Sequence, residues 1–114
     1  MKRIILASIV ALISSIAIGG VVEANEQAKK EKNCRNLMEI AESVMTQRQN
    51  GASIAKLLDV NDFAFKNSAD KTMKNVINHI IMDAFQEPYY NLPSLKRSQL
   101  TDFSAKYYIA CMMM

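Results

Sequence analysis

The two cysteines of this chain, Cys34 and Cys111, constrain its fold more than any other feature. Cys34 begins the cleanest long helical pattern that follows the N-terminal segment, and this pattern runs to Gly51. A bond between the cysteines would fix the first turn of that helix beside the last turn of the final helix. Closing so large a loop removes unfolded-chain entropy worth roughly 4–5 kcal/mol, comparable to the whole stability of a small domain. The pair therefore predicts a fold that is closed from its first helix to its last.

Residues 1–24 have the architecture of a signal peptide. Lys2 and Arg3 form a positive start, Ile4 to Ile18 is apolar, and Val22-Glu23-Ala24 resembles a cleavage site with small flanking residues. We expect cleavage after Ala24, which leaves residues 25–114 as a single helical domain in the periplasm or outside the cell. The uncharged run up to Val22 also reaches the lower length limit of a membrane-spanning helix, so a retained membrane anchor is the alternative.

Two cysteines behind an export signal usually form one disulfide bond. The alternatives are a zinc site and a catalytic thiol, and both require further ligands or a basic neighbour that the chain does not offer. The sequence therefore predicts that Cys34 and Cys111 form a structural disulfide.

Apolar residues at helical spacing indicate four helical segments in the mature chain. The first runs from Cys34 to Gly51, which ends it, and the third runs from about Ala69 to Gln86. The third segment has the most apolar stripe, so we expect it to pack centrally against the first. This stripe consists of Met73, Val76, Ile77, Ile80, Ile81, Ala84 and Phe85.

The connection between these two helices is harder to interpret. Ser53 is the expected N-cap of a short second helix that begins at Ile54, and the turn-forming residues from Asp59 to Asp62 interrupt it. Phe63 and Phe65 follow. Because there is no second strand for them to pair with, we expect a loop or helix end whose two rings fill the core.

The last two helices have clearer limits. Ser68 or Asn67 is expected to cap the third helix, and Pro88 ends it. Pro93 or Ser94 begins the last helix. Since short connections favour antiparallel neighbours, the last helix should run opposite to the first. The sequence thus predicts an all-α fold, a small up-down bundle of about four helices closed by one disulfide.

The segment from Asn25 to Lys32 is polar and lacks an apolar period, so we expect a frayed lead without core residues. It holds the densest basic cluster of the mature chain, Lys29-Lys30-Glu31-Lys32, which an acidic residue interrupts. A nucleic-acid-binding protein would show a continuous basic stripe. We therefore expect no nucleic-acid partner.

His79 is the only histidine, and Asp83 follows it one helical turn later. Such a pair could orient an imidazole for base catalysis or contribute to a metal site, but either role needs further groups. The sequence offers no second histidine, nucleophile elbow, phosphate-binding loop or calcium loop. We expect a surface histidine and a protein that is not an enzyme, with no catalytic residues, metal or cofactor.

Three patterns resemble small exported proteins that occur in proteobacterial, phage and prophage genomes. They are C-x-x-L-x-x-x-A-x-x-V-M-x-x-R-Q-x-G at Cys34 to Gly51, I-I-x-D-A-F-x-x-P-x-Y at Ile80 to Tyr90, and D-F-x-x-x-x-x-x-x-C at Asp102 to Cys111. The resemblance spans essentially the whole mature domain. It implies a secreted helical protein with a single disulfide, and it brings no established activity and no functional residues.

The leading hypothesis is an exported interaction protein whose partner is an unidentified envelope or periplasmic protein. An envelope modulator of phage or prophage origin is one form of it. The alternative is a periplasmic stress chaperone, similar to the small acid-activated helical chaperones with one disulfide, which would expose its apolar stripes in acid.

Four residues form the hypothesised partner-binding site: Arg48, Gln49, Tyr89 and Tyr90. The two tyrosines lie in a short turn bounded by prolines, where at least one ring should face water and offer rigid contact area. In an up-down bundle this turn lies at the same end as Arg48 only if the segment from Ile54 to Lys66 is a full helix.

Overall fold

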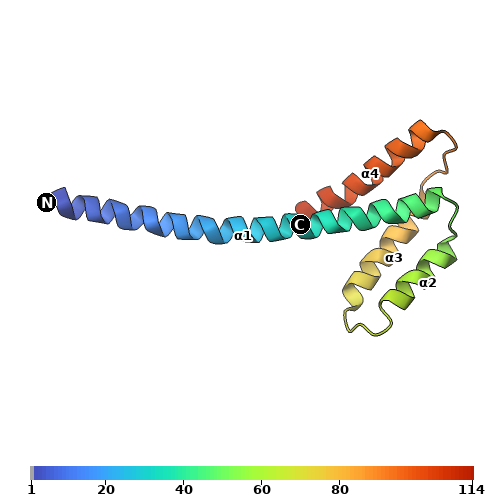
Figure 1. Ribbon diagram of the computed structural model, residues 1–114, viewed down its shortest axis with the longest axis horizontal. Helices are drawn as coiled ribbons and strands as arrows, with labels where there is room; N and C mark the ends of the chain where they lie inside the picture. Colours follow the sequence, from blue (N-terminus) through green and yellow to red (C-terminus); the bar gives the residue numbers. More distant parts are fainter. Residues whose placement is uncertain (1) are drawn as a thin grey trace. The chain divides into compact units, whose positions relative to one another are not determined.

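The computed structural model describes the backbone of residues 2–114 and the side chains from Ala24 onward. This part of the chain contains four α-helices and no strand: α1 (Lys2–Gln49), α2 (Ile54–Ala64), α3 (Lys71–Gln86) and α4 (Pro93–Met112) (Figure 1). The all-α prediction is confirmed. The chain divides into two compact units, Met1–Asn33 and Cys34–Met114.

The first unit consists of the N-terminal part of α1. The predicted signal peptide, residues 1–24, lies outside the described side chains except at Ala24, so its processing remains a prediction. Residues 25–32 are helical, which corrects the expected frayed lead, although none of them is buried. Among the residues with described side chains, no helix is both long and apolar enough to cross a membrane.

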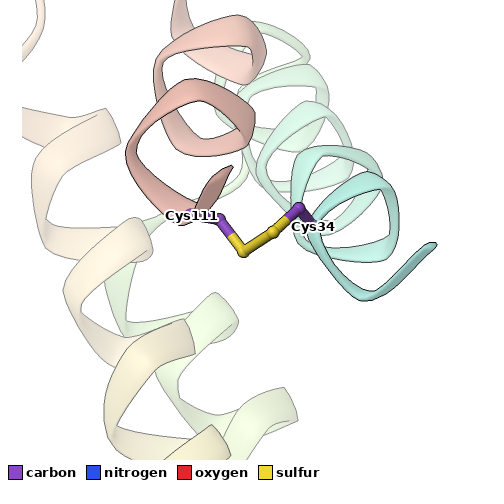
Figure 2. Close-up of a disulfide and its surroundings, with 2 residues drawn as sticks. All are labelled: Cys34 and Cys111. Carbon is purple, nitrogen blue, oxygen red and sulfur yellow. A yellow bond between two sulfur atoms is a disulfide. The ribbon is translucent and has the colours of Figure 1, made fainter. Parts of the chain in front are cut away.

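The second unit is the predicted bundle, and the disulfide closes it. Cys34 on α1 is bonded to Cys111 on α4, with the two Cα atoms 5.5 Å apart (Figure 2). At the other end, the Gln49 side-chain amide donates a hydrogen bond to the main-chain oxygen of Lys96 at 2.8 Å. The disulfide joins the start of this part of α1 to the end of α4, and the Gln49 hydrogen bond joins the end of α1 to the start of α4. The helix α4 therefore runs antiparallel to this part of α1.

The core of the bundle draws on all four helices, and α1 and α3 each contribute three buried residues to its apolar cluster. Ile80, Ile81 and Ala84 of α3 are buried, which confirms the central position predicted for the third helix. The remaining buried apolar residues of the cluster are Ala41, Val44 and Met45 from α1, Leu57 from α2 and Phe103 from α4. Fully burying such side chains stabilises a small domain by about 1.5–3 kcal/mol each.

The end of α1 and the start of α2 follow the predicted signals. Gly51 has φ of +94°, a left-handed conformation in which glycine avoids the strain of a side chain, and α1 ends just before it. The Ser53 hydroxyl accepts a hydrogen bond from the Lys56 amide at 3.1 Å, which confirms the predicted N-cap.

The predicted interruption of α2 at Asp59 to Asp62 is wrong, because the helix continues to Ala64. Asn61 is buried, and its side-chain amide donates to the Lys74 main-chain oxygen at 3.0 Å and to Asn78 Oδ1 at 2.8 Å. Since these partners lie on α3, a residue that would otherwise favour a turn is satisfied inside a helix. The tertiary contact therefore overrides the local turn preference.

The continuation of α2 also moves the two phenylalanines out of the core. Phe63 is 78% exposed, and Phe65, the C-cap residue, is only partly buried. The prediction that both rings fill the core is therefore wrong. Because α2 keeps its helical phase, Leu57 faces the core while Phe63 lies on the outer face of the helix.

The limits of α3 and α4 differ little from those predicted. Asp70, rather than Ser68 or Asn67, caps α3 by accepting a hydrogen bond from the Thr72 amide at 3.0 Å, and the Ser68 hydroxyl accepts one from the Asp70 amide at 3.1 Å. Pro93 stands at the first position of α4, as expected from its fixed φ.

Candidate functional site

The structure brings the hypothesised binding residues together at one end of the bundle. Because α2 is a full helix, the turn after α3 lies at the same end as the last residues of α1. We call Arg48, Gln49, Tyr89 and Tyr90 the binding edge. The sequence predicted this arrangement only if the second helix is complete, and that condition is met.

Arg48 packs against the turn that follows α3 and stabilises it. Its guanidinium lies 4.9 Å from the ring centroid of Phe85 and 5.2 Å from that of Tyr89. Its Nη2 donates to the Glu87 main-chain oxygen at 3.4 Å, while its Nε is buried without a hydrogen-bond partner. Arg48 thus acts first as a support for the turn, and its planar cation suits stacking on an aromatic ring.

Gln49 begins a chain of amide hydrogen bonds that fixes the same turn. Besides its bond to Lys96, it donates to Gln99 Oε1 at 3.0 Å. Gln99 in turn donates to the Pro88 main-chain oxygen at 2.8 Å. Both glutamines are therefore occupied within the protein, and their role in the edge is to position other groups.

The side chains that this support presents to solvent are apolar. Tyr89 is 52% exposed, and the Lys96 ammonium nitrogen lies 5.5 Å from the centroid of its ring. Leu92 is 60% exposed and Leu95 is 43% exposed. A turn fixed by hydrogen bonds that still exposes three large side chains is a preorganised contact surface.

Tyr90 has a different environment from Tyr89. It is partly buried and lines a small pocket of about 180 Å³ between the turn and the first turns of α4. The other lining residues are Glu87, Leu95, Ser98, Gln99 and Asp102.

Sequence reasoning missed Leu92, Leu95, Lys96 and Gln99 as members of this region. Gln99 carried a signal, because it lies one turn before the core residue Phe103 and a buried polar side chain requires a partner. The exposed leucines carried none, since a leucine near the start of a helix is equally compatible with burial.

A second polar cluster joins α3 to α4. The Asp83 carboxylate accepts hydrogen bonds from Lys106 Nζ at 2.6 Å and from the Tyr107 hydroxyl at 2.7 Å. Lys106 is exposed on α4, and its ammonium group pairs with Asp83 on α3. His79 is exposed, as predicted for a surface histidine.

The charges of this cluster shift the titration of its members. Partial burial alone would raise the pKa of Asp83, but the hydrogen bonds from Lys106 and Tyr107 and the positive charges of Lys106 and His79 outweigh it. The pKa of Asp83 therefore lies below its ordinary value. Burial and the neighbouring carboxylate raise the pKa of the Tyr107 hydroxyl above its usual range.

An apolar groove of about 220 Å³ lies between α1 and α2. Ile40 and Val44 line it from α1, and Leu57 and Val60 line it from α2. Ile77 and Ile81 of α3 form part of its wall. Among residues 24–114, no group of three or more side chains could hold a metal ion.

No family model, curated protein or solved structure matches this chain.

Proposed function

We propose that this chain is an exported, non-enzymatic interaction protein that binds a partner protein of the bacterial envelope through the binding edge. The observation that carries the proposal is the rigid turn after α3, which Arg48 and the two glutamines hold in place while Tyr89 and Leu92 stay exposed. Binding to a surface that is already ordered loses less conformational entropy than binding to a mobile loop. Exposed tyrosine on rigid backbone is also typical of protein interfaces.

Two further observations support an exported protein. A disulfide bond that closes most of the chain is typical of the periplasm and of secreted proteins, because the cytosol keeps thiols reduced. The resemblance to small exported proteins of proteobacteria and their phages points the same way and favours an envelope modulator.

The test is capture of envelope proteins by the purified protein and two matched variants. Tyr89→Ala removes an exposed ring from the binding edge, whereas Phe63→Ala removes an exposed ring from α2. We expect Tyr89→Ala to lose the captured partner and Phe63→Ala to retain it, with both melting temperatures close to that of the unmodified protein. Equal capture by the two variants would reject the edge as the binding surface.

A stress chaperone activated by acid is the second candidate, and the contact between Asp83 and α4 favours it. Protonation of Asp83 would remove the negative charge that pairs with Lys106 and would weaken the hydrogen bonds from Lys106 and Tyr107. Loosening of α4 would then expose Phe103 and the stripe of α3.

Circular dichroism between pH 7 and pH 2 separates the two candidates. Loss of the near-ultraviolet signal in acid, with far-ultraviolet signal retained and aggregation of a client protein suppressed, is the result expected for a chaperone. Tertiary structure that persists at pH 2 without holdase activity would reject the chaperone function.

A further inference from the structure

The pocket beside Tyr90 combines features that suit one kind of side chain. Glu87 and Asp102 supply carboxylates, Tyr90 supplies an aromatic ring, and Leu95 supplies an apolar wall. We call these four residues with Ser98 and Gln99 the acidic pocket. Its volume of about 180 Å³ fits a single extended side chain rather than a folded segment.

Both carboxylates of the acidic pocket lack an internal cation among the described residues. Lys106, one helical turn after Asp102, gives its ammonium group to Asp83 at 2.6 Å. Arg48 reaches Glu87 only through the main-chain oxygen, since its guanidinium is held between two aromatic rings. Lys106 and Arg48 are therefore engaged elsewhere, and neither carboxylate forms an ion pair within the described residues, so the negative charge of the pocket is available to an external cation.

The floor of the pocket is fixed. The Gln99 side chain accepts from Gln49 and donates to the Pro88 main-chain oxygen, so it cannot swing into the pocket without losing two hydrogen bonds. A long basic side chain could lay its aliphatic stem along Leu95 and the Tyr90 ring and place its charged head between the two carboxylates. Lysine and arginine are the residues with this combination of stem and charge.

We propose that the acidic pocket receives a lysine or arginine side chain of the partner protein, and that Tyr89 and Leu92 contact apolar residues beside it. This inference rests on the proposed function, because it names the chemistry that the binding edge recognises. Charge complementarity supports the proposal, because two carboxylates without an internal cation line a pocket next to the turn that exposes Tyr89 and Leu92. The partner segment is thus basic at one position and apolar around it.

The experiment is selection from a random linear peptide library against the purified, disulfide-bonded protein, followed by affinity measurement for one selected peptide. The pocket variant is the double substitution Glu87→Gln and Asp102→Asn. The charge-matched control is Glu42→Gln with Asp59→Asn, two exposed carboxylates on α1 and α2. Tyr89→Ala serves as the variant of the apolar surface.

We expect selected peptides to share a lysine or arginine with apolar neighbours. The pocket variant should weaken their binding about tenfold, which is what two solvent-accessible ion pairs supply together, and the control should change it by less than about twofold. Binding should also weaken as salt increases. Circular dichroism of each variant verifies that the fold is retained.

Three results would overturn the proposal. Selected peptides without a basic residue, or equal binding by the pocket variant and the control, would show that the carboxylates are not used. If Tyr89→Ala still abolished binding in that case, the binding edge would stand and only the acidic pocket would fall. If no peptide were selected, both the pocket and the proposed edge would be rejected. The same conclusion would follow if the pocket variant and Tyr89→Ala both bound the peptide normally.

Discussion

The α1–α4 pair and the α2–α3 hairpin are held together by different means. The first pair is joined by the disulfide at one end and by the hydrogen bonds of Gln49 at the other. The hairpin relies on the buried amide of Asn61 and on an exposed ion pair between Lys74 and Asp62 at 3.3 Å. The covalent link and the binding edge therefore lie at opposite ends of the α1–α4 pair, and at the binding edge the pair is held by hydrogen bonds.

The exposed surfaces of the two regions also differ. On the hairpin side, Phe63 is almost free of contacts and the groove between α1 and α2 stays open. On the α1–α4 side, the exposed Tyr89 is stacked near two cations. Exposed aromatic residues therefore have unequal value as binding groups, because only the stacked ring is already ordered before a partner arrives.

The largest expected effect comes from removing the covalent link of the α1–α4 pair. Replacing both cysteines, Cys34→Ser with Cys111→Ser, should lower the free energy of unfolding by roughly 4–5 kcal/mol, since the unfolded chain regains its loop entropy. Urea denaturation measures this loss. A change below about 1 kcal/mol would mean that the hydrogen-bonded end holds the two helices together by itself, and the comparison would have to be revised.

The next effect concerns Ile80, which is fully buried where the two regions meet. Ile80→Ala should cost roughly 2–5 kcal/mol, because it removes a large side chain and leaves a cavity. Met82→Ala, on the same helix but 48% exposed, is the matched control and should change stability little. Thermal or urea unfolding of both variants gives the comparison, and similar losses would contradict the central position of the α3 stripe.

Asn61 tests how strongly the hairpin depends on a single side chain. Asn61→Ala should cost about 1–3 kcal/mol, because Asn78 and the Lys74 main-chain oxygen lose their partner in a buried place. Amide hydrogen exchange should speed up more in α2 than in α4. Asp59→Ala, at an exposed position of α2, provides the control. Uniform acceleration over both regions would show that they unfold as one unit.

The smallest effect is the dependence of stability on acid. The pKa of Asp83 is lower in the folded protein than its ordinary value of 3.8, so its carboxylate stabilises the fold above that pH. This contribution is lost as the pH falls below 3.8 and through the folded-state pKa. Urea unfolding between pH 5 and pH 2 should therefore show a steeper decline for the unmodified protein than for Asp83→Asn. His79→Ala should follow the unmodified protein closely. Identical curves for all three proteins would show that Asp83 does not contribute to the loss of stability in acid.

Much of the fold follows from patterns that involve neighbours in sequence. The stripe of α3, the cap at Ser53 and the proline at the start of α4 each depend on residues within a few positions. The cap and the proline are confirmed, and the stripe is confirmed except at Met73, which is 38% exposed. The disulfide followed from two cysteines behind a segment with the pattern of a signal peptide. Where a partner distant in sequence decides the outcome, prediction was wrong, as at Asn61, which a contact with α3 keeps helical.

The candidate site shows the same division. The meeting of Arg48 and the tyrosine turn was predicted only on the condition that the second helix is complete, whereas its turn-forming residues predicted an interruption there. The chain of hydrogen bonds through Gln49 and Gln99 could not be predicted, because it joins residues fifty positions apart whose side-chain geometry exists only in the folded protein. The pairing of Lys106 with Asp83, which leaves Asp102 available, depends equally on the packing of α3 against α4.

The bond between Cys34 and Cys111 makes the bundle a closed ring of covalent links across a sequence separation of 77 residues. A protease that cuts the connection between α2 and α3, at Lys66 for example, would open the ring once and still leave every helix of the bundle attached to the others. The nicked molecule would migrate as one species until a reductant separates it into two fragments. A single cut inside the ring therefore does not release any helix of the bundle.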